Sequence, residues 1–211
     1  TARKLERLKA ILIEIEDNGM GMKQELLDHI FEPFFTTRRD KEGTGLGLSI
    51  SYGLVKEHNG LISVLSRPGL GSRFSIYLPF ENQKTLELHP AILCLDSDTK
   101  WLNEIKISLN GVIDWRCDAK DTMEDVLAFL EEHPEVDFLI SEIKLPAING
   151  WDLLKRVKER FPLLPAILYS ADSTSLKQEA KTATKPDFLL KKPFKISQLQ
   201  NMIQEIGRQK I

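Results

Sequence analysis

Residues 137–151 read DFLISEIKLPAINGW, an apolar run that ends in polar residues and is followed by Asn149-Gly150 at the start of a helical stretch. The same alternation recurs from Ala91 to the end of the chain. The apolar runs are Ala91–Leu95, Val112–Trp115, Val136–Ile140, Ala166–Tyr169 and Phe188–Leu190. Helical stretches are expected over 99–110, 120–132, 149–161, 174–182 and 196–208. Strict alternation predicts an α/β fold with a parallel five-stranded sheet, helices on both faces and a site at the carboxyl ends of the strands.

The first half of the chain has a different pattern. Residues 11–16 (ILIEIE) alternate apolar and acidic side chains, which predicts a half-buried strand. A short helix is expected over 23–30, because Pro33 blocks its continuation, and a longer helix over 46–58. Two further strands, 61–65 and 72–78, flank the turn sequence Pro68-Gly69-Leu70-Gly71 and predict an antiparallel hairpin.

The composition of the 211 residues fits two small domains. Residues 81–90 (ENQKTLELHP) are polar and end in proline, so we expect a linker between a domain over 1–80 and a second over 91–211. With 29 basic and 31 acidic side chains the chain has no basic field for nucleic acid, and no apolar run suits a membrane. Both cysteines lie in apolar runs without metal spacing, which predicts buried thiols in the cytoplasm.

Three short motifs in the first half carry chemistry. They are DNGMG at 17–21, FEPFF at 31–35 and GTGLGL at 43–48, the last opening a helix. In this order they resemble the ATP-binding domain of sensor histidine kinases, whose fold is shared with gyrase-type (GHKL) ATPases. The resemblance covers Ile11–Phe80 and implies the carboxyl-terminal half of such an α/β sandwich. It implies these ATP-binding residues: Asp17, Gly19, Gly21, Phe31, Arg38, Gly43, Thr44, Gly45, Leu46, Gly47 and Leu48.

The residue types suit that ligand. The Asp17 carboxylate can accept a hydrogen bond from the adenine amine, while Gly19 and Gly21 let the backbone approach a flat base. The glycines of 43–48 leave N–H groups open to phosphate at a helix N-terminus. Arg38, with Arg39 and Lys41, either closes over the phosphates or forms a solvated charge run, and the phenylalanines of 31–35 either pack the hinge of a lid or touch the ligand.

The resemblance also implies parts that the chain does not show. In that family an upstream helix supplies an asparagine for Mg²⁺, and a helical hairpin carries the phosphorylated histidine. Thr1–Ala10 is too short for that helix and its strand, and His29 and His58 lie outside any such motif. We therefore expect ATP and Mg²⁺ to serve a longer parent protein, which an amino-terminal region could anchor to a membrane, and we expect weak or no binding here. We also expect an incomplete sheet edge at 11–16 that could pair with another chain.

Residues 91–208 resemble a response-regulator receiver domain, which has a flavodoxin-like (βα)5 fold. That family places two acids after the first strand, an aspartate phosphoacceptor after the third, a hydroxyl residue after the fourth and a lysine after the fifth. The resemblance implies a degenerate Mg²⁺ site of Asp96, Asp98 and Glu142, with Ser97 at the second acidic position. It makes Glu142 the phosphoacceptor equivalent and Ser170 and Lys192 the switch residues.

Glutamate extends the carboxylate by one methylene, so we do not expect normal phosphorylation. Either Glu142 imitates the phosphorylated state toward Ser170 and Lys192, or it merely pairs with Lys192 in a pseudo-receiver. The implied function is two-component phosphorelay signalling by an ATP-dependent histidine kinase whose receiver gates or relays the signal. The implied partners are the upstream histidine-bearing dimerisation domain and a response regulator or phosphotransfer protein. The alternative is a non-enzymatic module that docks a partner through its last two helices.

Overall fold

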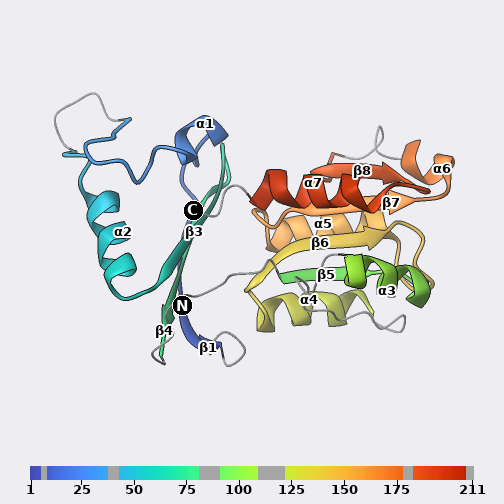
Figure 1. Ribbon diagram of the computed structural model, residues 1–211. Helices are drawn as coiled ribbons and strands as arrows, with labels where there is room; N and C mark the ends of the chain where they lie inside the picture. Colours follow the sequence, from blue (N-terminus) through green and yellow to red (C-terminus); the bar gives the residue numbers. More distant parts are fainter. Residues whose placement is uncertain (6–8, 38–42, 81–90, 109–121, 178–182, 208–211) are drawn as a thin grey trace. The chain divides into compact units, whose positions relative to one another are not determined.

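The computed structural model describes residues 1–5, 9–37, 43–80, 91–108, 122–177 and 183–207 (Figure 1). The chain divides into two compact units, Thr1–Leu88 and His89–Ile206. The segment 81–90, expected as a linker, lies outside the described residues.

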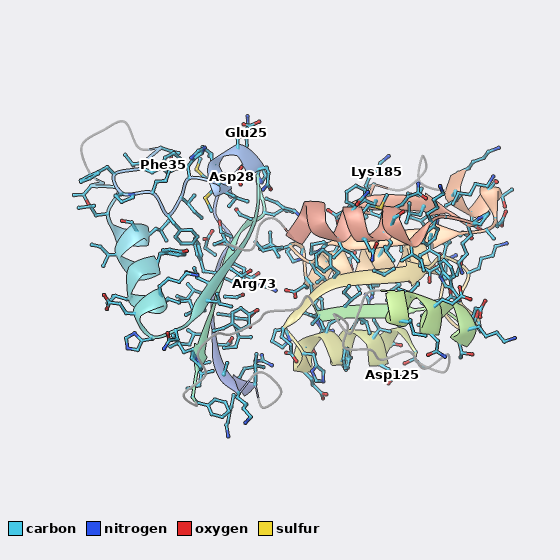
Figure 2. The ribbon with its side chains drawn as sticks, in the orientation of Figure 1. Glu25, Asp28, Phe35, Arg73, Asp125 and Lys185 are labelled. Carbon is cyan, nitrogen blue, oxygen red and sulfur yellow. The ribbon has the colours of Figure 1, made fainter. Side chains whose placement is uncertain are left out.

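The first unit is built on an antiparallel four-stranded sheet in the order β1-β2-β4-β3. Its strands are β1 (Ala2–Leu5), β2 (Ala10–Asp17), β3 (Leu61–Arg67) and β4 (Gly71–Pro79). The predicted strand at 11–16 and the predicted hairpin are thereby confirmed. Arg73, labelled in Figure 2, pairs with Glu16 directly opposite it on β2, with 2.7 Å between Nε and Oε2.

The edge of this sheet differs from our expectation. The strand β1 lies within the ten residues that we judged too short for a helix together with its strand, and it pairs with β2 from Ala2 opposite Ile13 to Leu5 opposite Ala10. The sequence ARKL has no clear alternation, so β1 depends on backbone pairing that a pattern of side chains does not reveal. Because β1 pairs with residues 10–13 of β2, the open edge expected at 11–16 is wrong for that part of the strand.

Two helices accompany the sheet. α1 (Gln24–Leu27) is shorter than predicted, whereas α2 (Gly47–Glu57) follows the predicted range and runs beside the sheet (Figure 1). α2 ends where Asn59 takes a left-handed φ of 53° and the Gly60 N–H bonds to the Val55 carbonyl at 2.8 Å. A small apolar core joins α1 and the following loop to the sheet; its buried members are Leu27, Ile30 and Val64, packed against Met22, Phe31, Phe35 and Phe74.

The loop after β2 lies against the turn of the β3–β4 hairpin. The Gly69 N–H donates to the Met20 carbonyl at 2.7 Å, and the Met22 N–H donates to Ser66 Oγ at 2.8 Å. Gly21 has a φ of 63°, and a Cβ there would lie 1.9 Å from the Arg67 carbonyl oxygen. Glycine is therefore required at position 21 for close approach of two backbones, a role other than contact with a base.

The second unit contains a parallel sheet in the order β5-β6-β7-β8. Its strands are β5 (Ala91–Leu95), β6 (Val136–Glu142), β7 (Ala166–Ser170) and β8 (Phe188–Lys191). Its helices are α3 (Thr99–Ser108), α4 (Met123–Glu132), α5 (Gly150–Arg160), α6 (Ser173–Leu176) and α7 (Ile196–Gly207). The predicted strand Val112–Trp115 lies outside the described residues, as do 178–182 of the predicted fourth helix. The architecture is the expected flavodoxin-like one.

Alternate side chains of the sheet pack under different helices. Leu93 and Leu95 lie in a core formed with α4 and α5, whereas Ile92 and Cys94 lie in a core formed with α3 and α7. The buried thiol predicted for Cys94 is confirmed, and Cys117 lies outside the described residues. With both faces covered, the strands are apolar throughout, and polar groups collect at their carboxyl ends.

We predict that Gly21→Ala destabilises the first unit. The new Cβ would collide with the Arg67 carbonyl, and a left-handed residue other than glycine adds strain, which together cost about 2 kcal/mol or more. Hydrogen exchange of the segment 61–79, measured by mass spectrometry, should become faster.

Gly53→Ala is the matched control, because a Cβ at Gly53 meets nothing within 4 Å and alanine favours a helix by about 1 kcal/mol. Equal protection in both variants would contradict the proposed backbone contact.

Candidate functional site

The first unit contains a cavity of about 390 Å³ between α1, the following loop and the start of α2. Phe35, labelled in Figure 2, belongs to this loop. The lining residues are Met22, Leu26, Ile30, Phe35, Thr36, Thr37, Gly43, Gly45, Gly47 and Leu48. One side is thus apolar and the other is glycine-rich backbone, a combination that suits a ligand with a flat apolar part and a polar tail.

The start of α2 supplies the polar side of this cavity. Its N-cap residue, Leu46, makes no side-chain cap, and the first turn of α2 contains no acidic residue. The first amide N–H groups of a helix lack intrahelical partners and carry partial positive charge. Since Gly47 and Leu48 line the cavity, the arrangement favours an anion there.

The glycine loop is fixed to the preceding segment. The Phe34 N–H donates to the Gly45 carbonyl at 3.0 Å, and a Cβ at Gly45, which has a φ of 66°, would lie 2.5 Å from the Phe34 carbonyl carbon. At Gly47, by contrast, a Cβ would meet nothing within 4 Å. Gly45 therefore shapes the loop, while Gly47 leaves the end of the helix open.

The structure brings some of the expected ATP-binding residues to the cavity. Gly43, Gly45, Gly47 and Leu48 line it. The other expected residues, which are not part of the lining, are Asp17, Gly19, Gly21, Phe31, Thr44 and Leu46. Arg38, Arg39 and Lys41 lie outside the described residues.

Asp17 and Phe31 make other contacts. Asp17 Oδ1 accepts the Gly19 N–H at 2.7 Å, and the Phe31 ring lies 5.0 Å from that of Tyr52. Sequence reasoning missed Met22, Leu26 and Ile30 as lining residues. Their spacing of four residues, typical of one helical face, was the signal that could have found them.

In the second unit, the carboxyl ends of the strands hold a buried acidic cluster. Asp96 follows β5, and its side chain is only 2% exposed. Its Oδ2 accepts hydrogen bonds from Lys192 Nζ at 2.7 Å and from the Tyr169 hydroxyl at 2.8 Å, while Oδ1 accepts the Asp98 N–H at 2.8 Å. Both oxygens of Asp96 are thus engaged by protein donors.

Lys192 joins the two carboxylates of the cluster. Its Nζ lies 3.2 Å from Glu142 Oε2, in addition to its contact with Asp96. The same ammonium lies 4.7 Å from the centre of the Tyr169 ring and 5.2 Å from that of Trp101. Two carboxylates and two aromatic rings therefore hold a single cation.

Tyr169 is a member of the site that sequence reasoning missed. It is fully buried at the end of β7, and burial is the main cause that raises the pKa of its phenol well above the ordinary value. The phenol therefore stays protonated and donates its hydrogen to Asp96. A polar tip in an apolar run, next to Ser170, was the available signal.

Ser170 lies beside the cluster with its own partners. Its hydroxyl oxygen accepts the Asp172 N–H at 3.2 Å, and its carbonyl accepts the Lys192 N–H at 2.9 Å. Asp172 caps α6, and the bond from Lys144 is the main cause that lowers its pKa. Ser170 thus fixes the backbone of Lys192 and does not hold the Glu142 carboxylate.

The expected metal ligands are not gathered as a metal site. Asp98 is exposed and caps α3, where its Oδ1 accepts the N–H groups of Lys100 at 3.0 Å and Trp101 at 3.1 Å. Over the described ranges, no group of three His, Cys, Asp or Glu residues could hold a metal ion. The residues present do not fit Mg²⁺, because the ammonium of Lys192 already joins Asp96 to Glu142.

Two protein families match the chain. The family described as "Histidine kinase-, DNA gyrase B-, and HSP90-like ATPase" matches residues 2–82, and the "Response regulator receiver domain" matches residues 92–204. The chain belongs to the receiver domain family. Ahead of the receiver it carries the kinase-type ATPase domain, and this order of domains is that of a hybrid sensor kinase in two-component signalling.

The curated relatives are longer proteins. The sensor kinase CckA of Brucella abortus is 31% identical over 228 residues, which cover 97% of this chain and 24% of the relative. The autoinducer 2 sensor kinase/phosphatase LuxQ of Vibrio parahaemolyticus is 28% identical and covers 88% of this chain and 24% of the relative. The chain therefore spans about a quarter of the length of these relatives.

A solved CheY-like receiver domain protein of Methanospirillum hungatei is 23% identical, with a TM-score of 0.48. The match covers 57% of this chain and 95% of the solved chain.

No helix among the described residues has the length and apolar character that would let it cross a bilayer.

We predict that Asp96→Asn destabilises the receiver unit by about 3 kcal/mol, because loss of one buried partner leaves the ammonium of Lys192 with incomplete compensation. Urea unfolding followed by tryptophan fluorescence reports on this unit, since all three tryptophans lie beyond residue 100.

Glu131→Gln is the control, because its ion pair with Arg160 is about half exposed and contributes less than about 1 kcal/mol. Equal losses in the two variants would contradict a special role for the buried pair.

Proposed function

We propose that this chain is part of a hybrid sensor histidine kinase, with an ATP-binding unit over 1–80, a linker over 81–90 and a receiver over 91–211. The intact kinase would phosphorylate a histidine on an upstream dimerisation domain, and the receiver would gate the signal to a response regulator or phosphotransfer protein. The order of the two matched families supports this proposal, as do relatives whose names describe sensor kinases. A cytoplasmic location follows from such a role.

The cavity beside α2 is the observation that carries the ATP part of the proposal. Its volume of about 390 Å³ lies in the range of small-molecule sites. The base would lie against Met22, Leu26 and Ile30, and the phosphates would face the N–H groups at Gly47 and Leu48. Asp17 would accept the adenine amine through the carboxylate oxygen that does not hold the Gly19 N–H. ATP would supply the phosphoryl group for the kinase reaction.

The receiver is proposed to work without normal phosphorylation. Glu142 carries its carboxylate one methylene further than aspartate does, and that carboxylate contacts Lys192. The hydroxyl of Ser170 bonds elsewhere. These contacts favour a pseudo-receiver in which Glu142 pairs with Lys192 over one in which Glu142 imitates a phosphoryl group.

The preformed cluster also favours a second candidate function, a module that docks a partner independently of phosphorylation through α6 and α7. ATP-dependent autophosphorylation of a longer parent would support the kinase function. Its absence, with partner binding intact, would support the docking module.

We predict that calorimetric titration with ATP and Mg²⁺ detects at most weak binding, and that Asp17→Asn lowers this affinity by a further factor of about ten, the effect of losing one charge-assisted hydrogen bond. Asparagine can still accept the Gly19 N–H, so the loop should keep its conformation.

Asp28→Asn is the matched control, because Asp28 is an exposed carboxylate next to α1 (Figure 2) that lies outside the three motifs. Equal affinity of the two variants would argue against a role of Asp17 in base recognition.

We also predict that acetyl phosphate does not label the chain, because the longer carboxylate is misplaced for in-line attack and is paired with Lys192. The measurement is incorporation of radioactive phosphate in the presence of Mg²⁺. Strong labelling that disappears in Glu142→Gln would contradict the pseudo-receiver.

A further inference from the structure

The acidic cluster of the receiver unit already contains a cation. We propose that the Lys192 ammonium takes the place of a divalent metal between Asp96 and Glu142, and that Tyr169 is the positioning residue that closes Asp96 to Mg²⁺. This inference deepens the proposed function and rests on it.

Both carboxylate oxygens of Asp96 accept hydrogen bonds from the protein. Its Oδ2 receives hydrogen from both Lys192 and Tyr169, and its Oδ1 receives the Asp98 N–H. A metal ion binds the lone pairs of carboxylate oxygens, which are the positions that these donors occupy. Both lone pairs of Oδ2 are thus taken, and Mg²⁺ could bind this oxygen only by displacing Lys192 or Tyr169.

Lys192 is held in place at its backbone and at its ammonium group. Its backbone N–H is bonded to the Ser170 carbonyl at 2.9 Å, so the side chain starts from a fixed point. At the other end, the Trp101 and Tyr169 rings lie 5.2 and 4.7 Å from the ammonium. A metal ion would easily displace a lysine whose side chain is mobile. Displacing Lys192 would cost its contacts with two aromatic rings and two carboxylates, so Mg²⁺ has to offset a larger loss of free energy.

The two residues that follow Asp96 offer no further metal ligand. Ser97 is exposed and has no carboxylate, and Asp98 caps α3. Mg²⁺ requires near-octahedral oxygen coordination and usually takes one or two carboxylates with water. Only Asp96 and Glu142 remain for that role, and Lys192 joins them.

Tyr169 is the residue that makes the arrangement specific. It is fully buried, and its ring meets that of Phe194 edge-on with 5.5 Å between centres. β7 pairs with β6 so that Tyr169 lies opposite Glu142 in register. The hydroxyl is thus held at Asp96 by the packing of the sheet, and removing only its oxygen should loosen the cluster while leaving the core filled.

The test is calorimetric titration of the whole chain with MgCl₂ alone. The wild type should show no saturable binding at millimolar concentrations. Tyr169→Phe should show saturable binding in the same range, since one hydrogen bond to a charged acceptor no longer competes and the affinity for Mg²⁺ rises by at least about tenfold. Tyr52→Phe, which removes a hydroxyl from α2 in the other unit, should behave as wild type.

A second variant addresses the ammonium itself. Lys192→Gln leaves the two carboxylates without their shared cation, so MgCl₂ should raise its thermal unfolding temperature relative to EDTA. The wild type should show no such rise. Circular dichroism would establish that each variant is folded.

Saturable binding of Mg²⁺ by the wild type would overturn the inference. A folded Tyr169→Phe with no gain would overturn the role of Tyr169, and a folded Lys192→Gln that Mg²⁺ does not stabilise would overturn that of Lys192. These outcomes differ from failure of the proposed function. Wild type that binds Mg²⁺ but is not labelled by acetyl phosphate leaves the pseudo-receiver intact, whereas labelling on Glu142 would remove it.

Discussion

The ion pair between Asp96 and Lys192 is the interaction on which the receiver unit depends. It joins the end of β5 to the end of β8, residues 96 positions apart, and so fixes the sheet at the edge where its functional groups meet. Burying a carboxylate is costly unless charge and hydrogen bonds compensate it. Here the ammonium and the Tyr169 hydroxyl provide that compensation, so no additional cation is needed for the fold.

In the first unit the corresponding constraint is steric. Gly21 and Gly71 let the loop after β2 and the hairpin turn approach more closely than any Cβ would allow, since a Cβ would lie 1.9 Å from the Arg67 oxygen or 2.0 Å from the Asp17 oxygen. The same hairpin supplies Val64 and Phe74 to the core beneath α1. Gly21, which the motif presents as a ligand contact, therefore also positions the loop that carries Met22 at the cavity.

Sequence reasoning predicted the features that periodicity and motif order encode. The four described strands of the receiver, the hairpin, α2 and the glycine loop beside the cavity follow from such patterns. β1 was not predicted because its pairing depends on the backbone and leaves no pattern of side chains. The bounds of α1 were not predicted because the local sequence pattern does not determine where a helix ends. Tyr169 was not predicted as a site residue because an aromatic residue in an apolar strand usually belongs to the core. Only the folded structure brings its hydroxyl to Asp96.

The cluster also limits how the receiver could be switched. A ligand or modification shifts a two-state equilibrium only by the difference in its interaction with the two states. In an ordinary receiver that difference would come from a phosphoryl group and its metal, whereas here the Lys192 ammonium already joins Asp96 to Glu142 within the protein. Under the proposed pseudo-receiver function, contact with a partner protein would supply the free energy that biases the two states. Such a receiver would respond to whether the partner is bound.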